Sequence, residues 1–306
     1  MARHIILRLL RALIVAFIVV TAVFFVFRLT PGDPARQIAG LGASEEAVRR
    51  VRAELGLDRP VWEQYVDYLA GVARLDLGRS HIYSRPVLDI ILEHLPPTLA
   101  LAGAAMGLAV ILGVPFGIIS ALKPYSWFDA AVTFLSVSLL SIPNFWLGLI
   151  LINYFAVRLN WLPAGGYGGL PFLVMPAVAV AARILALVSR TVRSSVLETA
   201  QQDYVRTARA KGLPETLVVG KHILRNALIP VLTLVGMQTG YLLGGSIVIE
   251  TLFSYQGTGW LFISGIGMRD YTLVQGLTIF YTISFLLLTL VVDLVYTWVD
   301  PRIRYR

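Results

Sequence analysis

Residues that commonly carry covalent chemistry are few and scattered in this sequence. The chain of 306 residues has no cysteine and only four histidines, at His4, His81, His94 and His222. The histidines form no HExxH zinc motif, and the lack of cysteine excludes a disulfide framework and a thiolate metal site. Gly220-Lys221 is followed by a histidine, so it is not the GxxxxGK(S/T) loop that binds nucleotide phosphates. The sequence therefore favours neither a protease nor an ATPase.

Polar side chains inside long apolar stretches are the second set of candidates. They are Ser136, Ser138, Ser141 and Asn144 around Pro143, and Gln238 and Thr239 further along. Polar groups at membrane depth usually face the interior of a helix bundle. We therefore predict a solute path lined by Ser141, Asn144, Gln238 and Thr239. Hydrogen bonding between helices is the alternative, and it fits the serines better.

Small residues and one acid in these stretches have simpler explanations. Gly236, Gly240 and Gly244 recur every four residues, which predicts a face for close helix packing. Asp293 lies about one and a half turns inside the last apolar stretch. Structural pairing of its carboxylate is a better explanation than a proton relay.

The polar, basic segment 190–227 is the most informative part of the chain. Helix-forming residues run from about Glu198 to Lys211, and Gly212 stands where a C-cap glycine belongs. Pro214 then favours a second helix that runs towards Arg225. The residues alone fit two roles equally well, an amphipathic helix on the anionic inner leaflet or a docking site for a partner.

The composition indicates that these residues belong to a membrane protein. Hydrophobic residues make up 57% and charged residues 14% of the chain, against about 45–50% and about 25% in soluble domains. The net charge of +8 fits membrane orientation better than nucleic-acid binding, because the basic residues lie at the ends of apolar segments. The uncharged stretches are 12–27, 96–122, 130–157, 159–182, 226–249, 251–268 and 271–292.

Six of these stretches are predicted to span the membrane. The glycine-rich stretch 251–268 is predicted to be a loop, either re-entrant or outside the membrane, because glycine weakens a helix. Both chain ends then lie in the cytoplasm, and the short outside loops carry only Arg158 and Arg269. A seventh span would place the basic tail outside. The first stretch is read as a retained helix rather than a signal peptide, since no small-residue cleavage site follows it.

The predicted organisation has three parts. Residues 1–28 form the first span, 29–95 a helical extracytoplasmic segment, and 96–306 a five-helix core that includes the loop 190–227. Within 29–95, helices are predicted to begin at Ser44 and at Pro60. A packed cap is the better explanation for this segment, and docking of an external partner is the alternative.

The loop resembles the EAA region of ATP-binding cassette (ABC) importer permeases. The family's Glu-Ala-Ala, Gly and Ile/Leu-x-Pro stand here as Glu198-Thr199-Ala200, Gly212 and Leu228-Ile229-Pro230. A closer resemblance is to the dipeptide/oligopeptide permeases, whose DYVRTARAKG and HxLRNALIP occur at 203–212 and 222–230. Further family motifs follow in order at Pro31–Pro34, Leu55–Asp58, Gln64-Tyr65, Asp76–Gly78 and Asp300–Arg304. The resemblance thus covers nearly the whole chain.

The resemblance implies an all-α integral membrane protein of the prokaryotic cytoplasmic membrane, with six transmembrane helices and the type I importer permease fold. Such a chain imports di- or oligopeptides, with nickel chelates or glutathione as the alternative. It is not an enzyme and holds no cofactor, because ATP and Mg²⁺ bind to two partner ATPase subunits. A homologous second permease and an extracytoplasmic substrate-binding protein complete the complex.

The resemblance also assigns roles to residues. Coupling to the ATPase falls to Glu198, Ala200, Asp203, Tyr204, Arg206, Thr207, Ala208, Arg209, Lys211 and Gly212. Tyr204 and Ala208 lie one turn apart and are predicted to form the apolar contact with the partner. Glu250 is a gate or docking residue by resemblance only.

Two positions depart from the family pattern. Gln256-Gly257-Thr258-Gly259 replaces Pro-Gly-x-Gly, and Thr289 replaces a frequent asparagine. Both changes are expected to affect gating or selectivity. An ion-coupled secondary transporter is the alternative from another class, but it would often show internal repeats and would need an ion site, and the sequence shows neither.

Overall fold

The computed structural model describes residues 2–29, 34–39, 42–54 and 56–299. These residues are helical apart from loops and one isolated bridge between Arg79 and Pro86. The chain divides into two compact units, 1–96 with 257–286 and 97–256 with 287–306. The family motif at Pro31–Pro34 and the basic C-terminal tail, with its motif at Asp300–Arg304, are not covered by this description, and neither is the side chain of Asp293.

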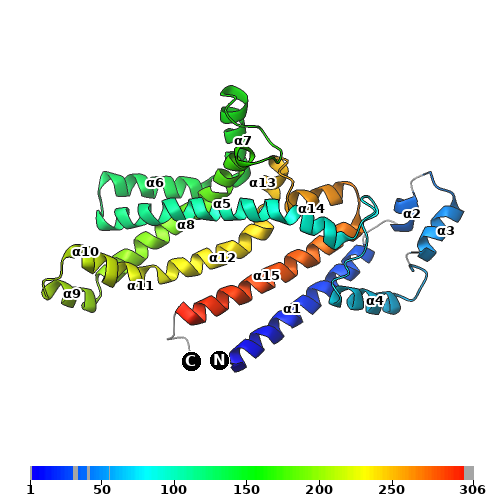
Figure 1. The fold of residues 1–306 in the computed structure, drawn as a ribbon, viewed down its shortest axis with the longest axis horizontal. Helices are drawn as coiled ribbons and strands as arrows, with labels where there is room; N and C mark the ends of the chain where they lie inside the picture. The colour runs from blue at the N-terminus through cyan, green and yellow to red at the C-terminus, as the bar shows by residue number, and fades with distance from the viewer. Residues whose placement is uncertain (1, 30–33, 40–41, 55, 300–306) are drawn as a thin grey trace. The chain divides into compact units, whose positions relative to one another are not determined.

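The first unit contains the N-terminal helix and the segment that follows it (Figure 1). Its helices are α1 (Ala2–Leu29), α2 (Pro34–Ala39), α3 (Glu45–Glu54), α4 (Val61–Ala73), the start of α5 (Val87–Leu122), α14 (Thr258–Gly267) and most of α15 (Tyr271–Val299). The starts predicted at Ser44 and Pro60 are confirmed, and the Ser44 hydroxyl accepts a bond from the Ala47 amide at 3.3 Å. The boundary predicted between 95 and 96 falls inside α5, which begins at Val87, and lies one residue from the division between the two units after Pro96.

A small apolar core holds part of this unit together. Val87, Ile90 and Ile91 at the start of α5 are buried against Leu261 of α14 and against Leu273 and Leu277 of α15. Residues 258–267 form helix α14, so the predicted loop is wrong over this range. Burial of Leu261 in the core stabilises this helix in spite of its glycines. Its ten residues are too few to cross a membrane, so the segment is no seventh span.

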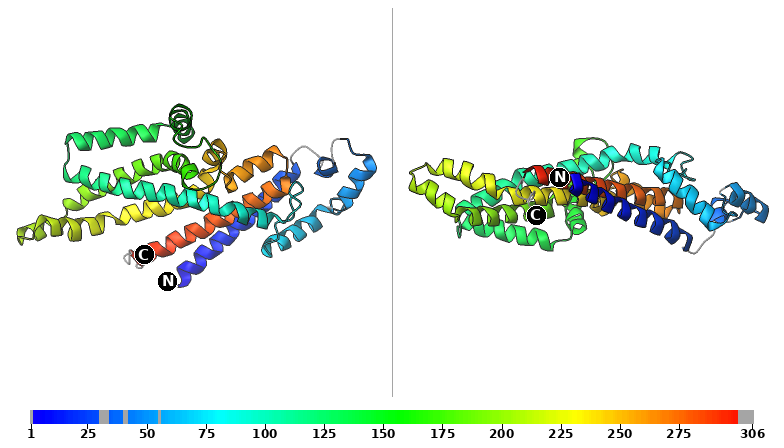
Figure 2. Two further views of the ribbon diagram at one scale, coloured as in Figure 1. Left: turned by 45° about the horizontal axis from the view of Figure 1, so that its top comes forward. Right: turned by 90° about the horizontal axis from the view of Figure 1, so that it is seen from below.

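The second unit contains the remaining helices, which surround α8. They are the rest of α5, then α6 (Trp127–Ser141), α7 (Asn144–Leu151), the π-helix η1 (Ile152–Arg158), α8 (Leu170–Ala200), α9 (Asp203–Ala210), α10 (Glu215–Leu217), the π-helix η2 (Val218–Leu224), α11 (Arg225–Ala227), α12 (Ile229–Gly245), α13 (Ile247–Leu252) and the end of α15. In Figures 1 and 2, α9 and α10 lie at one end of this unit, whereas α7 and α13 lie at the other.

The stretch 130–157 is not one straight helix. The segments Trp127–Ser141 and Asn144–Arg158 meet at an angle of 102°. Ile142 adopts an extended conformation with ψ of 124°, as expected for a residue before proline. Pro143 therefore ends α6 and precedes α7, and Ser141 and Asn144 stand on either side of the bend.

The stretch predicted as the fourth span is shifted along the chain. Residues 159–169 are not helical, and the helix runs from Leu170 to Ala200 instead of ending at 182. The glycines explain the late start, since Gly166 and Gly169 have φ of 112° and 116°, which few other residues tolerate. The helix continues past 182 because a single charged side chain at Arg183 does not break the backbone hydrogen bonds, and most of the residues that follow are buried or half-buried against neighbouring helices.

The number of possible spans agrees with the family fold. Among the residues that the structure describes, four helices are long and apolar enough to cross a membrane, and the number rises to six if each of two bent pairs is one span. The second bent pair joins Glu215–Ala227 to Ile229–Leu242 at 42°. Its first limb is the second helix predicted in the loop 190–227.

Helices α5 and α8 approach closely at two glycines that lie one turn apart. A methyl group at Gly117 would stand 2.5 Å from the Ser189 carbonyl oxygen, and one at Gly113 would stand 3.1 Å from the Leu185 carbonyl. Small residues at this spacing allow helix backbones to pack in contact. The predicted glycine face on α12 is only partly of this kind: Gly236 packs on Val292, but nothing lies within 4 Å of a methyl group at Gly244.

We expect Gly117→Ala to destabilise the protein by about 1–3 kcal/mol, because the added carbon overlaps backbone that cannot rotate away. Gly107→Ala on the same helix is the control, since nothing lies within 4 Å of its added methyl group. The thermal midpoint of the purified protein in detergent measures both. Equal midpoints for the two variants would show that the α5–α8 contact tolerates a methyl group.

Candidate functional site

The segment predicted to contact a partner lies at the end of α8. The single helix expected over 198–211 is broken at 201–202, where α8 ends and α9 begins. The turn predicted at Gly212 is confirmed, with φ of 73° and a 2.9 Å bond from its amide to the Arg209 carbonyl. A second helical segment then runs from Glu215 to Ala227.

One side of α9 is buried within its own chain. Val205 and Ala208 are 0% and 5% exposed in the core of the second unit. The predicted contact of Ala208 with a partner is therefore wrong, because this side chain already packs inside the chain. Tyr204 is 43% exposed, and its hydroxyl accepts a 3.2 Å bond from the Asn226 amide.

The other side of α9 presents polar groups to solvent. The exposed residues of the predicted coupling set are Glu198, Asp203, Tyr204, Arg206, Thr207, Arg209, Lys211 and Gly212, whereas Ala200 is half-buried. Arg209 reaches across the glycine turn to Glu215 at 2.7 Å, and Arg206 lies 3.8 Å from Asp203. The Arg209 pair closes the turn within the chain, so Arg206 and Lys211 are the more available cations.

A buried ion pair lies two turns before the end of α8, and no local pattern in the sequence indicates it. The Arg193 guanidinium of α8 donates two hydrogen bonds to the Asp129 carboxylate of α6, at 2.6 and 2.8 Å. Asp129 also accepts bonds from the Ser120 hydroxyl and from the Tyr125 amide. The side chains of Asp129 and Arg193 are 6% and 30% exposed. This pair fixes α8, two turns before its end, to the first turn of α6.

The predicted path and gate residues are distributed over four helices, α6, α7, α12 and α13. Ser141 is exposed and bonds back to the Val137 carbonyl at 2.9 Å, and Asn144 is half-buried at the first residue of α7. Gln238 and Thr239 are half-buried on α12. Glu250 is fully buried on α13 and accepts a 2.7 Å bond from the Ser246 hydroxyl.

These path residues are thus only partly brought together. Helix α7 packs against α13 through Gly148, where an added methyl group would stand 2.6 Å from Leu252. Asn144 and Glu250 therefore belong to packed neighbours. Thr239 bonds to the Val235 carbonyl of its own helix at 2.8 Å. This bond and the Ser141–Val137 bond each lie within a single helix. Thr239 and Ser141 therefore do not make the hydrogen bonds between helices that were the alternative for such groups.

Arg183 is a charged residue well inside α8 that none of the predicted spans contains. It is exposed, although its neighbours Ala182 and Ile184 are 7% and 3% exposed. Counting only uncharged stretches ended the predicted span at 182 and hid this residue. Arg183 can be recognised in the sequence as a single charged residue with apolar residues continuing on both sides.

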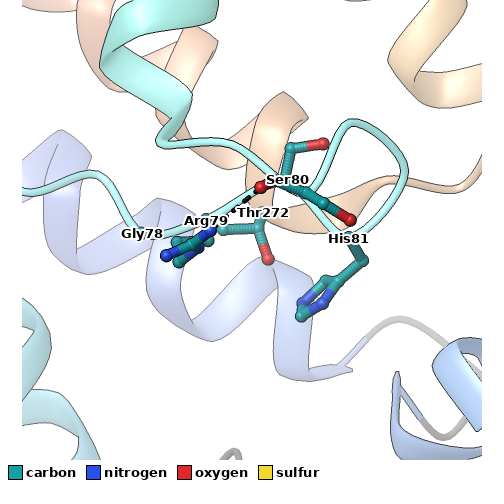
Figure 3. Close-up of a pocket in the computed structure, with 6 residues that line it drawn as sticks. Gly78, Arg79, Ser80, His81 and Thr272 are labelled. Atoms are coloured by element: carbon teal, nitrogen blue, oxygen red, sulfur yellow. Dashed lines mark hydrogen bonds between the residues drawn. The ribbon is translucent and has the colours of Figure 1, made fainter.

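An open pocket of about 490 Å³ lies in the first unit (Figure 3). It is lined by Gly78, Arg79, Ser80, His81, Ser84 and Thr272. Arg79 donates a 2.9 Å bond to the Ser84 carbonyl, and the Ser80 hydroxyl bonds to the Asp270 carboxylate. Burial, together with the nearby Asp270 carboxylate, raises the pKa of the Tyr83 phenol above its ordinary value. These contacts hold the loop against the start of α15.

Comparison with known proteins settles the family. A family model described as "Binding-protein-dependent transport system inner membrane component" matches residues 113–305, and its N-terminal companion matches residues 1–102. This chain belongs to that family. The chain is 42% identical over 306 residues to the glutathione transport system permease protein GsiC of Escherichia coli strain K12, and the match covers 100% of both chains. The same protein of Shigella dysenteriae serotype 1 shows the same identity and coverage.

Solved structures show the same fold for this inner membrane component. A crystal structure of an amino acid ABC transporter with histidines matches 68% of this chain and 94% of its own, with a TM-score of 0.57 and 15% identity. An inward-facing structure of the MetNI methionine ABC transporter matches 70% of this chain and 97% of its own, with a TM-score of 0.57 and 19% identity. The chain has the importer permease fold.

The inner membrane component is the permease subunit of an ABC importer and a multi-pass protein of the inner membrane. This excludes the ion-coupled secondary transporter that the sequence left open. The resemblance to permeases of the peptide, nickel and glutathione type is confirmed by the full-length relatives.

Proposed function

We propose that this permease carries a small peptide-like solute of the glutathione class into the cytoplasm. The observation that supports this class is 42% identity along the whole chain to glutathione transport system permeases. Dipeptides and oligopeptides, the substrates first expected, share the peptide bonds and carboxylates of glutathione and remain the nearest alternative.

Coupling to ATP hydrolysis is proposed to occur at the end of α8 and along α9. Val205 and Ala208 fasten α9 to the permease, while Arg206 and Lys211 stay exposed on its outer side. A helix fixed on one side and charged on the other suits the transmission of force from a partner. ATP and Mg²⁺ would bind to two separate ATPase subunits, because the sequence holds no phosphate-binding loop.

The remaining assignments complete the proposal. A homologous second permease forms the other half of the path, and an extracytoplasmic protein delivers the solute. Both chain ends and the loop 190–227 lie in the cytoplasm, as the distribution of basic residues supports. The segment 29–95 lies outside. Closure of the ATPase subunits would rock the spans between two states.

Isolation of the complete complex tests this proposal. We expect the permease, purified in mild detergent, to retain a second permease and an ATPase, and vesicles that contain the complex to take up labelled glutathione only with ATP and the binding protein. Mass spectrometry of the ligand released from the binding protein identifies the solute directly. A non-peptide ligand would overturn the substrate class, and failure to retain any ATPase would overturn the coupling site.

A further inference from the structure

Arg183 lies deep within a helix that is long enough to cross the membrane. Helix α8 runs from Leu170 to Ala200, and at 1.5 Å per residue Arg183 lies about 20 Å along the axis from Leu170. The next basic residue, Arg190, lies about 10 Å further on. A hydrocarbon core is about 30 Å thick, so Arg183 falls inside it, in the half nearer the coupling site.

Arg183 is the first residue of the solvent-exposed face of this helix, called the open face below. Positions 183, 187, 190, 194 and 198 share one side of an α-helix. Arg183, Arg190, Ser194 and Glu198 are exposed there and Leu187 is half-buried, whereas the other sides hold buried residues such as Ile184, Val188 and Val192. The open face therefore leads from Arg183 to the coupling residues at the end of α8.

Contact with lipid is energetically unfavourable for the Arg183 side chain. An arginine at the centre of a spanning helix costs about 2.5–3.5 kcal/mol on insertion scales. Side chains on a helix point towards its N-terminus, which directs Arg183 away from the nearer polar end at Arg190. Among the residues that the structure describes, no ion pair of Arg183 is found. Its charge therefore requires a polar environment outside its own chain.

We propose that Arg183 lines the translocation path and binds a carboxylate of the transported solute. This proposal rests on the proposed function, in which the solute is peptide-like and therefore carries carboxylates. A guanidinium offers two parallel N–H donors to a carboxylate, and this geometry gives specificity as well as attraction. The solute class assigned to this path is thus an organic anion.

The absence of cysteine from the chain makes the test direct. Arg183→Cys introduces a single thiol, which membrane-impermeant methanethiosulfonate reagents label only where water reaches it. Mass spectrometry of the chain within the assembled complex reports the labelled fraction. We expect labelling to differ between ATP-bound and nucleotide-free complexes, since the path opens to one side at a time. Absence of labelling in both states would place residue 183 against lipid or inside a protein interface and would overturn the proposal.

The charge of the label then tests the carboxylate. S-Methylglutathione serves as the solute, because its blocked thiol cannot remove the label. We expect Arg183→Cys and Arg183→Gln to lower its uptake about ten-fold, the loss of one hydrogen-bonded charge. An aminoethyl label, which is cationic, should restore most of the uptake, whereas a sulfonatoethyl label should lower it further. Equal effects of the two labels would overturn the assignment.

Arg190→Cys is the matched control on the same face, and its two labels should alter uptake by less than about two-fold. Failure of the substrate class is distinguishable from failure of this inference. If the unsubstituted complex takes up no S-methylglutathione, the proposed solute is wrong, and the ligand released from the binding protein replaces it in the same comparison. Restoration by an anionic label would instead show that residue 183 pairs with a cation.

Discussion

Replacing Arg193 with alanine should destabilise the permease by about 3–5 kcal/mol, the usual cost of removing one partner from a buried ion pair. Asp129 is 4% exposed and would keep only the bonds from Ser120 and the Tyr125 amide. A buried carboxylate without a cation is strongly unfavourable. Asp129→Asn should cost less, because the amide is neutral and still accepts a hydrogen bond.

The measurement is the thermal midpoint of the purified complex, together with the amount of folded protein in the membrane. Arg190→Ala is the control, because Arg190 is exposed on the same helix and surface substitutions stay within about 0.5 kcal/mol. The exchanged variant, with Asp129→Arg and Arg193→Asp together, should recover part of the loss. A midpoint for Arg193→Ala equal to that of Arg190→Ala would contradict the structural role of the pair.

The pair also has a consequence for transport. It joins α8, close to α9, to the first turn of α6, and α6 leads to the 102° bend with Ser141 and Asn144 beside it. Movement of α9 by a partner would therefore move α6 and α8 together. Asp129→Asn is expected to lower the amount of solute moved per ATP in complexes that remain folded at the temperature of the assay.

The sequence was sufficient where one local signal dominates. The turn after α9 follows from Gly212, which adopts φ of 73°, and the starts of α3 and α4 follow from Ser44 and Pro60. The family itself follows from unbroken motifs in order. Each of these features depends on residues that are adjacent in the chain, so no knowledge of the tertiary structure is required.

Features that depend on distant residues were missed. The bond between Arg193 and Asp129 joins positions 64 residues apart, and no local pattern marks either partner. Ala208 looked available to a partner because helical spacing gives a face but does not say which face is already covered. Arg183 was missed because spans were predicted only from stretches without any charge. A spanning helix tolerates a charge where its neighbours are polar or water is present.

The turn at Gly212 provides the second large effect. We expect Gly212→Val to abolish uptake, because a β-branched residue at φ of 73° is strained by about 1–2 kcal/mol, and relief of that strain would rotate α9 relative to the Glu215–Ala227 segment. The Arg209–Glu215 pair spans this turn at 2.7 Å and would separate with it. The α9 surface that is proposed to meet the ATPase would then point elsewhere, while insertion into the membrane stays intact.

Two further variants separate conformation from size. Gly212→Asn should keep most of the uptake, since asparagine tolerates the left-handed conformation. Gly220→Ala, in the same loop, should be neutral, because nothing lies within 4 Å of its added methyl group. Uptake into vesicles and ATP hydrolysis are measured on the same preparations. Loss of uptake in Gly212→Val with ATP hydrolysis retained locates the fault at the coupling step, whereas normal uptake in that variant would show that the left-handed turn is not needed for coupling.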